Sequence, residues 1–324
     1  SWWGSPVQNG WGGIYYDYAS NALADFGLGD RITDEGGFIE NTDALEAYDQ
    51  EGRSPQPTIL MIPSAYRDGT LLSALPSDGS GDFTFSRGSL STRTDSLGVV
   101  NDVTGVDTPR INYVGTPHLL MEPTRTNLFV KSNVLTDGGI WKRNSSMVTT
   151  GNATISPDGT LNATRLVKVG GGGRLGQEVA LTKDLTYTFS FYMKNNGGNT
   201  GFDISLNGQA AAQSYTITND WARYEFTFTA TSTETSQIRL VSGVSDIDLF
   251  AFGAQLEVGS SATSYIPTDA SIKTRLQDVA TLDLTGFGIT SIVETIDEVE
   301  QSPITVIPST YSIPMGKITK IEMY

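Results

Sequence analysis

His118 is the only histidine in the sequence, and the chain contains no cysteine. A serine or cysteine hydrolase needs a nucleophile beside a base, and no GxSxG nucleophile elbow occurs in the sequence. His118 lies in TPHLLMEP between Pro117 and two leucines, where a packed or hydrogen-bonded residue is the ordinary outcome. One histidine completes neither a catalytic triad nor a usual metal site, so we expect a structural role for His118.

Two other features could support chemistry, and neither predicts an enzyme. Glycoside hydrolysis needs only two carboxylates about 5–10 Å apart, and 36 acidic residues make chance pairs inevitable. The sequence lacks, however, the repeat of long aromatic-lined strands that a depolymerase β-helix would show. The glycine run at 170–173 lies between two strand-like stretches, which predicts a hairpin turn and not a phosphate-binding loop. We expect no catalytic residues, and glycan hydrolysis stays as a lesser alternative.

Aromatic and amide side chains between residues 124 and 270 are candidates for binding a sugar. Such binding needs aromatic faces for stacking, together with amide and hydroxyl partners. Trp221 opens a strand in which polar residues alternate with apolar ones, so it shares the polar face, although packing is an equal alternative. The candidate residues are Trp141, Tyr192, Asn207, Gln209, Tyr215 and Trp221.

Composition restricts both the fold and the partners. The formal charge of −15 and a pI of about 4.4 leave no basic surface for phosphate contacts, so we expect no nucleic-acid partner. No run approaches the eighteen or so apolar residues of a membrane span, so we expect no membrane insertion. The 35 glycines, the 13 prolines and the many Thr, Ser, Asn, Tyr and Val residues favour an all-β fold of short strands and tight turns.

Residues 1–57 are an acidic segment rich in aromatic residues. Ten acidic side chains against two arginines give this segment about −8 of the total charge. Its pattern has no sustained period of 2 or 3.6, apart from a short helix predicted in NTDALEAYDQEG. Aromatic residues are enriched where surfaces dock, so we predict an N-terminal docking arm that becomes ordered on its partner. The docking candidates are Trp2, Trp3, Trp11, Tyr15, Tyr16 and Tyr18.

The remaining chain divides into three predicted β segments. Residues 58–123, with the apolar run TILMIP and strands such as DFTFSR, are expected to form a β-linker that oligomerises. Residues 124–270 contain seven or more alternating strands separated by turns, which predicts an antiparallel β-sandwich. Residues 271–324 are expected to form a short β-tail, swapped between subunits as one alternative. In LTYTFSFYMK the residues Leu185, Tyr187, Phe189 and Phe191 are predicted to share a core face.

Two stretches resemble known families. FTFSRGSLSTRTDSLG, followed by PRINY and HLLMEPTRTNLF, resembles a run shared by many phage tail and virion fibre proteins. DGTLNATRL, YTFSFYMK, DWARYEFTFTAT and DLFAFGAQLEVGSSATSYIPT resemble the carbohydrate-binding modules of phages. The resemblance implies a jelly-roll sandwich in a bacteriophage fibre or spike subunit, located in the virion. It also implies partners among the capsid, collar or tail proteins and recognition of host surface polysaccharide.

Further expectations rest on the same resemblance. Phage fibre proteins are commonly trimers, and Ile59–Ile62 lack local partners, so a homotrimer is expected. Arg87, Arg93, Arg110 and Arg125 are interpreted as staples that cross-link loops or neighbouring chains. Related modules hold a structural calcium with an acidic residue of the last strand, which points to Asp248. Solvated carboxylates in turns are the alternative for this residue and for Asp78–Asp82. A decoration or collar protein without ligand, and a glycan-degrading tail-spike enzyme, remain alternative functions.

Overall fold

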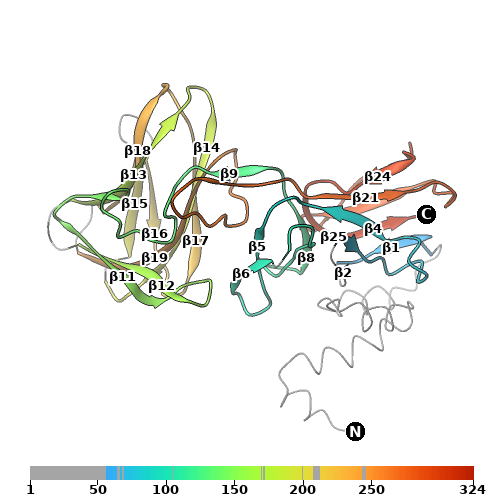
Figure 1. Cartoon of the computed structure of the whole chain (residues 1–324), viewed down its shortest axis with the longest axis horizontal. Helices are drawn as coiled ribbons and strands as arrows, with labels where there is room; N and C mark the ends of the chain where they lie inside the picture. Colours follow the sequence, from blue (N-terminus) through green and yellow to red (C-terminus); the bar gives the residue numbers. More distant parts are fainter. Residues whose placement is uncertain are drawn as a thin grey trace, which may run out of the picture. The chain divides into compact units, whose positions relative to one another are not determined.

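A computed structural model describes residues 56–324, except 64–65, 68, 104, 169, 171, 199, 207–211 and 243–245. Its elements are all β-strands, which confirms the expected all-β class with an antiparallel sandwich (Figure 1). The predicted N-terminal arm, with Trp2, Trp3, Trp11, Tyr15, Tyr16 and Tyr18, lies outside the described residues, as does the short helix predicted within it. In the described part of the chain, no helix is long and apolar enough to cross a membrane.

The chain forms two compact units. The first unit comprises residues up to 98, 102–124 and 276–324, and the second comprises 99–101 and 125–275. The two larger sheets of the first unit have the strand orders β23-β22-β25-β8-β7 and β2-β3-β4-β21-β24, and β1 also pairs with β25. Its strands, with β6 at the boundary, are β1 (Ile59–Met61), β2 (Tyr66–Arg67), β3 (Thr70–Leu71), β4 (Phe83–Ser86), β5 (Ser91–Thr94), β6 (Val100–Val103), β7 (Ile111–Asn112), β8 (His118–Met121), β21 (Val279–Asp283), β22 (Ile292–Ile296), β23 (Val299–Glu300), β24 (Thr310–Ser312) and β25 (Gly316–Met323).

The apolar run at the start of the first unit is buried within the chain. Strand β1 pairs antiparallel with β25, with Ile59 opposite Met323 and Met61 opposite Ile321. All four side chains are buried in a core to which residues of both 58–123 and 276–324 contribute. The expectation of a trimer started from the premise that this run lacks partners within its own chain, and that premise is wrong. The C-terminal segment supplies the partner strand, so the segments expected to be a linker and a tail share one core.

The second unit is a sandwich of two five-stranded antiparallel sheets. One sheet has the order β10-β13-β18-β15-β16, and the other has the order β11-β12-β19-β14-β17. A short pair, β9 and β20, lies beside them in the same unit. The strands are β9 (Arg125–Asn127), β10 (Lys142–Arg143), β11 (Met147–Ile155), β12 (Leu161–Lys168), β13 (Gly173–Leu181), β14 (Thr186–Asn195), β15 (Gly201–Leu206), β16 (Ala212–Thr216), β17 (Ala222–Thr229), β18 (Glu234–Ser242), β19 (Ile247–Val258) and β20 (Lys273–Arg275).

Alternation along the strands places one large core between the two sheets. On β14 the side chains of Tyr187, Phe189 and Phe191 enter this core, as the period of two predicts. Leu185 was expected on the same face, but it lies before β14 and is 41% exposed. On β17 the side chains of Phe226 and Phe228 are buried in the same core. Stacked and edge-on aromatic contacts, such as Phe189 with Phe191 at 5.0 Å, fill its centre.

Candidate functional site

The two sheets of the sandwich differ in what lies on their outward faces. On the sheet that contains β14, the outward side chains of Thr188, Ser190, Gln255 and Glu257 are all buried. The segment 262–268 lies over them, because Thr263 donates from its backbone N to Glu257 Oε2 at 3.0 Å. We call this sheet the covered sheet. The part of its outward face around these four side chains is closed to a large ligand.

Several polar groups beneath that segment are hydrogen-bonded. Gln255 Oε1 accepts a hydrogen bond from the backbone N of Ile266 at 2.6 Å. Arg223 donates from Nη1 to Thr263 O at 2.7 Å and from Nη2 to Ser190 Oγ at 2.8 Å. Buried polar groups are costly unless they are hydrogen-bonded. These hydrogen bonds therefore allow polar side chains to be buried between the sheet and the covering segment. This layer holds the covering segment in place.

The other sheet, β10-β13-β18-β15-β16, presents a polar outward face, and we call it the open sheet. Its strand register places Lys142, Gly176, Arg239 and Ser205 in one row across four strands. A second row contains Arg174, Val241, Asp203 and Ser214, and Glu178 lies opposite Gln237 beyond the first row. All these residues are exposed or half-buried except Gly176. The alternate residues, among them Leu175, Phe202, Ile204, Ile238 and Leu240, enter the core.

Gly176 contributes no side chain in the middle of the first row, and it is itself buried. A Cβ added at this position would lie 2.4 Å from the carbonyl oxygen of Ile238, a distance that real side chains do not adopt. The neighbouring strand therefore requires glycine here. Since strands are about 4.8 Å apart, Lys142 and Arg239 stand on strands roughly 10 Å apart. The nearest side chain to Gly176 on this side is that of Gln237, whose Cγ lies 3.1 Å from the Cβ position.

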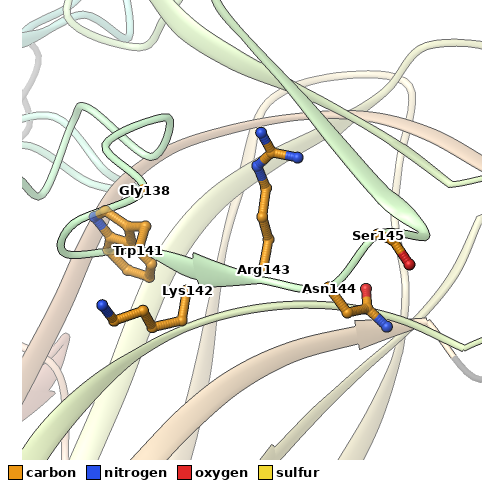
Figure 2. A pocket seen from close by; sticks show the side chains of 6 residues that line it. All are labelled: Gly138, Trp141, Lys142, Arg143, Asn144 and Ser145. Atoms are coloured by element: carbon orange, nitrogen blue, oxygen red, sulfur yellow. The ribbon is translucent and has the colours of Figure 1, made fainter.

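A pocket of about 350 Å³ lies at the β10 edge of the open sheet. Figure 2 shows Lys142 and Arg143 extending to different sides of β10, next to Trp141. Asn144 ties this edge to β13, because its Oδ1 accepts a hydrogen bond from the backbone N of Arg174 at 3.1 Å. The residues that line the pocket are Gly138, Trp141, Lys142, Arg143, Asn144 and Ser145. Lys142 thus belongs both to the pocket and to the first row of the open sheet.

The open sheet concentrates positive charge around Gly176. Partial burial, and then repulsion by Arg174, lower the pKa of the Arg239 guanidinium below its usual value. The Nε of Arg239 donates to Gln237 Oε1 at 2.7 Å, an amide oxygen without charge. Two guanidinium groups therefore face each other diagonally on this sheet without a carboxylate between them.

Two of the predicted aromatic candidates belong to the core side of the sandwich. Trp141 is fully buried, its ring packs edge-on against Phe129 at 5.3 Å, and its Nε1 donates to Lys131 O at 3.0 Å. Tyr215 is half-buried on edge strand β16, where its hydroxyl donates to Glu225 O at 2.5 Å. Burial and the charge of Glu225 raise the pKa of Tyr215 to about 12. Trp141 has no free face on which a sugar ring could stack.

Tyr192 and Trp221 lie on the outward face of the covered sheet. Tyr192 has the guanidinium of Arg223 over its ring at 5.4 Å. Trp221 packs with Tyr192 against a small cluster of Val100, Phe252 and Tyr265, and its Nε1 donates to Ile155 O at 3.1 Å. Asn207 and Gln209 lie outside the described residues, between β15 and β16 in the sequence. The structure therefore does not gather the described aromatic candidates at one site.

Asp248, the expected calcium ligand, is paired with an arginine. Arg165 donates from Nε to Asp248 Oδ1 at 2.7 Å and from Nη2 to Oδ2 at 2.5 Å. This bidentate pair lowers the pKa of the Asp248 carboxyl. Among the described residues, no group of three or more His, Cys, Asp or Glu side chains could hold a metal ion. A guanidinium thus occupies both carboxylate oxygens that were expected to bind calcium.

Residues of the fibre-like motif form a buried charge network in the first unit. Asp278 accepts hydrogen bonds from Arg87 and Arg110, and Arg110 also pairs with Glu122 at 2.7 Å. The carboxylates of Glu122 and Asp278 raise the pKa of Arg110 although burial alone would lower it. These two arginines therefore cross-link segments within one chain.

His118 is buried in the same unit and has hydrogen-bond partners for both ring nitrogens. Its Nδ1 lies 2.7 Å from Thr116 O, and its Nε2 lies 3.3 Å from Asn112 Nδ2. A carbonyl oxygen can only accept, so Nδ1 donates, and the amide nitrogen of Asn112 donates to Nε2. Burial lowers the pKa of His118, which favours this neutral form. His118 acts here as a packed, hydrogen-bonded residue.

Comparisons with known proteins bear on the second unit. Residues 129–246 match the family model described as a carbohydrate binding domain. The chain is similar to a Family 16 Carbohydrate Binding Module-2, at 21% identity over 40% of this chain and 99% of the other, with a TM-score of 0.32. It is similar to TmCBM61 in complex with β-1,4-galactotriose, at 12% identity over 41% and 99%, with a TM-score of 0.32.

Another similar structure is the enzymatically active domain of tailspike protein 4 of bacteriophage CBA120. The identity is 14% over 41% of this chain and 21% of that chain, with a TM-score of 0.34. No curated protein sequence matches the chain. The segment that matches the family model contains every strand of the open sheet, and it ends just before β19 of the covered sheet. The second unit is therefore a carbohydrate-binding-type β-sandwich, which confirms the coarser part of the resemblance.

Sequence reasoning missed the polar residues of the open sheet as site residues. The signal was present, because Arg174 and Glu178 alternate with apolar residues in RLGQEVAL, as do Gln237 and Arg239 in SQIRLVSG. Alternation alone does not show which of the two sheets is covered. The segment 262–268 decides this, and it is distant in sequence from the strands of the open sheet.

Proposed function

We propose that this chain recognises glycans without cleaving them, and that the outward face of the open sheet is the binding surface. The observation that carries the proposal is the difference between the two sheets of one sandwich. The covered sheet buries four outward polar side chains, those of Thr188, Ser190, Gln255 and Glu257, under residues 262–268, whereas the open sheet exposes two rows of polar and charged side chains. Guanidinium, ammonium, amide, carboxylate and hydroxyl groups supply donors and acceptors for sugar hydroxyls. The match to a carbohydrate binding domain supports this assignment.

We further propose that the chain is a subunit of a bacteriophage fibre in the virion. In this proposal the N-terminal segment attaches it to the capsid, collar or tail, and the chain acts as a homotrimer. The support is the resemblance of about residues 58–130 to phage fibre proteins. Light scattering on the full chain tests the trimer, since three times the mass of one chain is expected. Gold-labelled antibodies on purified particles test the location, and particles without label would contradict it.

A pair of matched substitutions tests the binding surface. Ser205→Trp places a bulky side chain in the first row of the open sheet, and Thr229→Trp places the same side chain on an exposed edge position of the covered sheet. Binding of the full chain to an array of bacterial polysaccharides is the measurement. We expect Ser205→Trp to abolish binding and Thr229→Trp to retain it. Unchanged binding by folded Ser205→Trp would contradict the assigned face, and a wild-type chain that binds no polysaccharide would contradict the function.

A further inference from the structure

The cations of the open sheet surround a position that carries no side chain. Gly176 has Lys142 and Arg239 beside it on the neighbouring strands, and Arg174 and Glu178 two residues away on its own strand. Three of these four positions are therefore cationic. Lys142, Arg174 and Glu178 are exposed and Arg239 is half-buried, so these side chains reach solvent around the position of Gly176.

In the described part of the chain, neither arginine of this group forms a salt bridge, although Glu178 and Asp203 lie diagonally from Arg239 on the same face. Salt bridges hold other arginines of the molecule, such as Arg165 with Asp248. Arg239 instead bonds the amide oxygen of Gln237, and its pKa is lowered partly by the charge of Arg174. Like charges placed diagonally on a sheet repel each other. A ligand that carries negative charge would relieve this repulsion, whereas a neutral ligand would not.

The charge of the whole chain does not oppose such a ligand at this face. Residues 125–275 contain thirteen Lys and Arg against twelve Asp and Glu, while residues 1–57 alone carry about −8. At physiological ionic strength, exposed charges are screened over about 8 Å. The charges within the open face therefore govern what binds there.

We infer that the open sheet binds a glycan with carboxylate groups, with one carboxylate between Arg174, Arg239 and Lys142 over Gly176. This inference rests on the proposed function and names its class of ligand. Planar guanidinium groups bind carboxylates through two parallel hydrogen bonds, which gives direction as well as attraction. These cations flank Gly176, and Ser205, Gln237 and Glu178 provide partners for the sugar hydroxyls around them. Described aromatic side chains are absent from this face, so charge and not stacking selects the ligand.

The test uses the full chain and pairs of polysaccharides that differ only in charge. Alginate, polygalacturonate, hyaluronan and polysialic acid are each compared with their carboxyl-reduced, neutral forms. We expect at least one acidic member to bind and its reduced form to bind roughly tenfold or more weakly, since hydrogen bonds to charged groups are the stronger ones. Binding should also weaken between 50 and 500 mM salt. The distance over which exposed charges interact falls from about 10 Å at 0.1 M to about 3 Å at 1 M salt.

A double variant, Arg174→Gln with Arg239→Gln, should lose this preference. The matched control is Lys183→Gln with Lys273→Gln, which removes two exposed cations outside the open face, and it should keep the preference. Equal binding to the acidic and reduced forms would overturn the inference and leave the proposed function standing. If the folded double variant still prefers the acidic polysaccharide to its reduced form, the inference is also overturned. A chain that binds none of these polysaccharides and none on the array would overturn both.

Discussion

Asp278 Oδ1 accepts a hydrogen bond from Arg87 Nη1 at 3.0 Å, and both side chains are completely buried. The two residues are 191 positions apart in the sequence, so this pair joins the N-terminal and C-terminal parts of the first unit. Asp278 Oδ2 also accepts from Arg110 and, at 2.8 Å, from the backbone N of Glu122. One carboxylate thus holds three segments together.

Replacing this carboxylate is expected to unfold the first unit selectively. Asp278→Asn removes the buried carboxylate that pairs with Arg87 and one of the two that pair with Arg110, and removal of one partner of a buried pair costs about 3–5 kcal/mol. Hydrogen exchange read by mass spectrometry should show loss of protection in residues 58–98, 105–124 and 276–324 and none in the sandwich. Glu300→Gln is the control, because Glu300 is exposed in the same unit and should change stability by less than about 0.5 kcal/mol. Equal effects of the two variants would contradict the role of Asp278.

Gly176 should resist even the smallest substitution. The added methyl group of Gly176→Ala would meet the Ile238 carbonyl oxygen at 2.4 Å, so the sandwich must shift at a cost of about 1–3 kcal/mol. Gly172→Ala, just before the same strand, is the control because nothing lies within 4 Å of its Cβ position. Urea unfolding followed by tryptophan fluorescence measures both, since Trp141 is buried in this core. A tolerated Gly176→Ala would show that β13 and β18 are less closely spaced than described.

The sandwich is expected to lose stability in acid, partly through Asp248. The hydrogen bonds from Arg165 hold the pKa of Asp248 below its usual value. As the pH falls, the unfolded chain therefore takes up a proton at this residue before the folded chain does. The contribution is complete above the unfolded pKa of about 3.9 and disappears as the pH falls through the lower folded pKa. Unfolding free energies between pH 2 and 6 should show a shallower loss for Asp248→Asn than for the wild type, and identical slopes would refute the assignment.

Chelators should leave the melting temperature of the sandwich unchanged. Arg165 uses both carboxylate oxygens of Asp248 that a structural calcium would need. A metal bound only to the native state would stabilise it. A fall in melting temperature in chelator would therefore support the calcium site and contradict this prediction. The Arg165 and Asp248 side chains are 42% and 24% exposed, and exposed pairs contribute little to stability. Arg165→Gln should therefore lower stability only slightly in calorimetry.

The sequence predicted the strands of the sandwich well and the candidate site poorly. Alternation in LTYTFSFYMK placed Tyr187, Phe189 and Phe191 in the core correctly, because period two follows directly from strand geometry. Trp141 stands between GGI and KR, without an alternating pattern that could show its burial. The pairing of Arg165 with Asp248 depends on strand register across 83 residues, and a single sequence does not contain this information.

The first unit shows a further limit of the sequence. The run TILMIP was recognised as needing apolar partners, and the burial of Ile59 and Met61 confirms that need. Nothing local indicated that β25 would supply them, because the pattern of GKITKIEM fits any edge or central strand equally. The pairing of Asp278 with buried arginines could not be predicted for the same reason. Nothing in KTRLQDV indicates that this aspartate is buried beside Arg87 and Arg110.

The pairing of β1 with β25 sets the order in which the chain can fold during synthesis. All strands of the sandwich leave the ribosome before Gly316, and domains fold as units as soon as their residues are available. The apolar strand β1, although made first, has to wait for the last strand described. During this interval its side chains are open to solvent and to other nascent chains, so we expect slow or crowded synthesis to cause aggregation through β1. A chain truncated before residue 316 should keep a folded sandwich and lose the first unit.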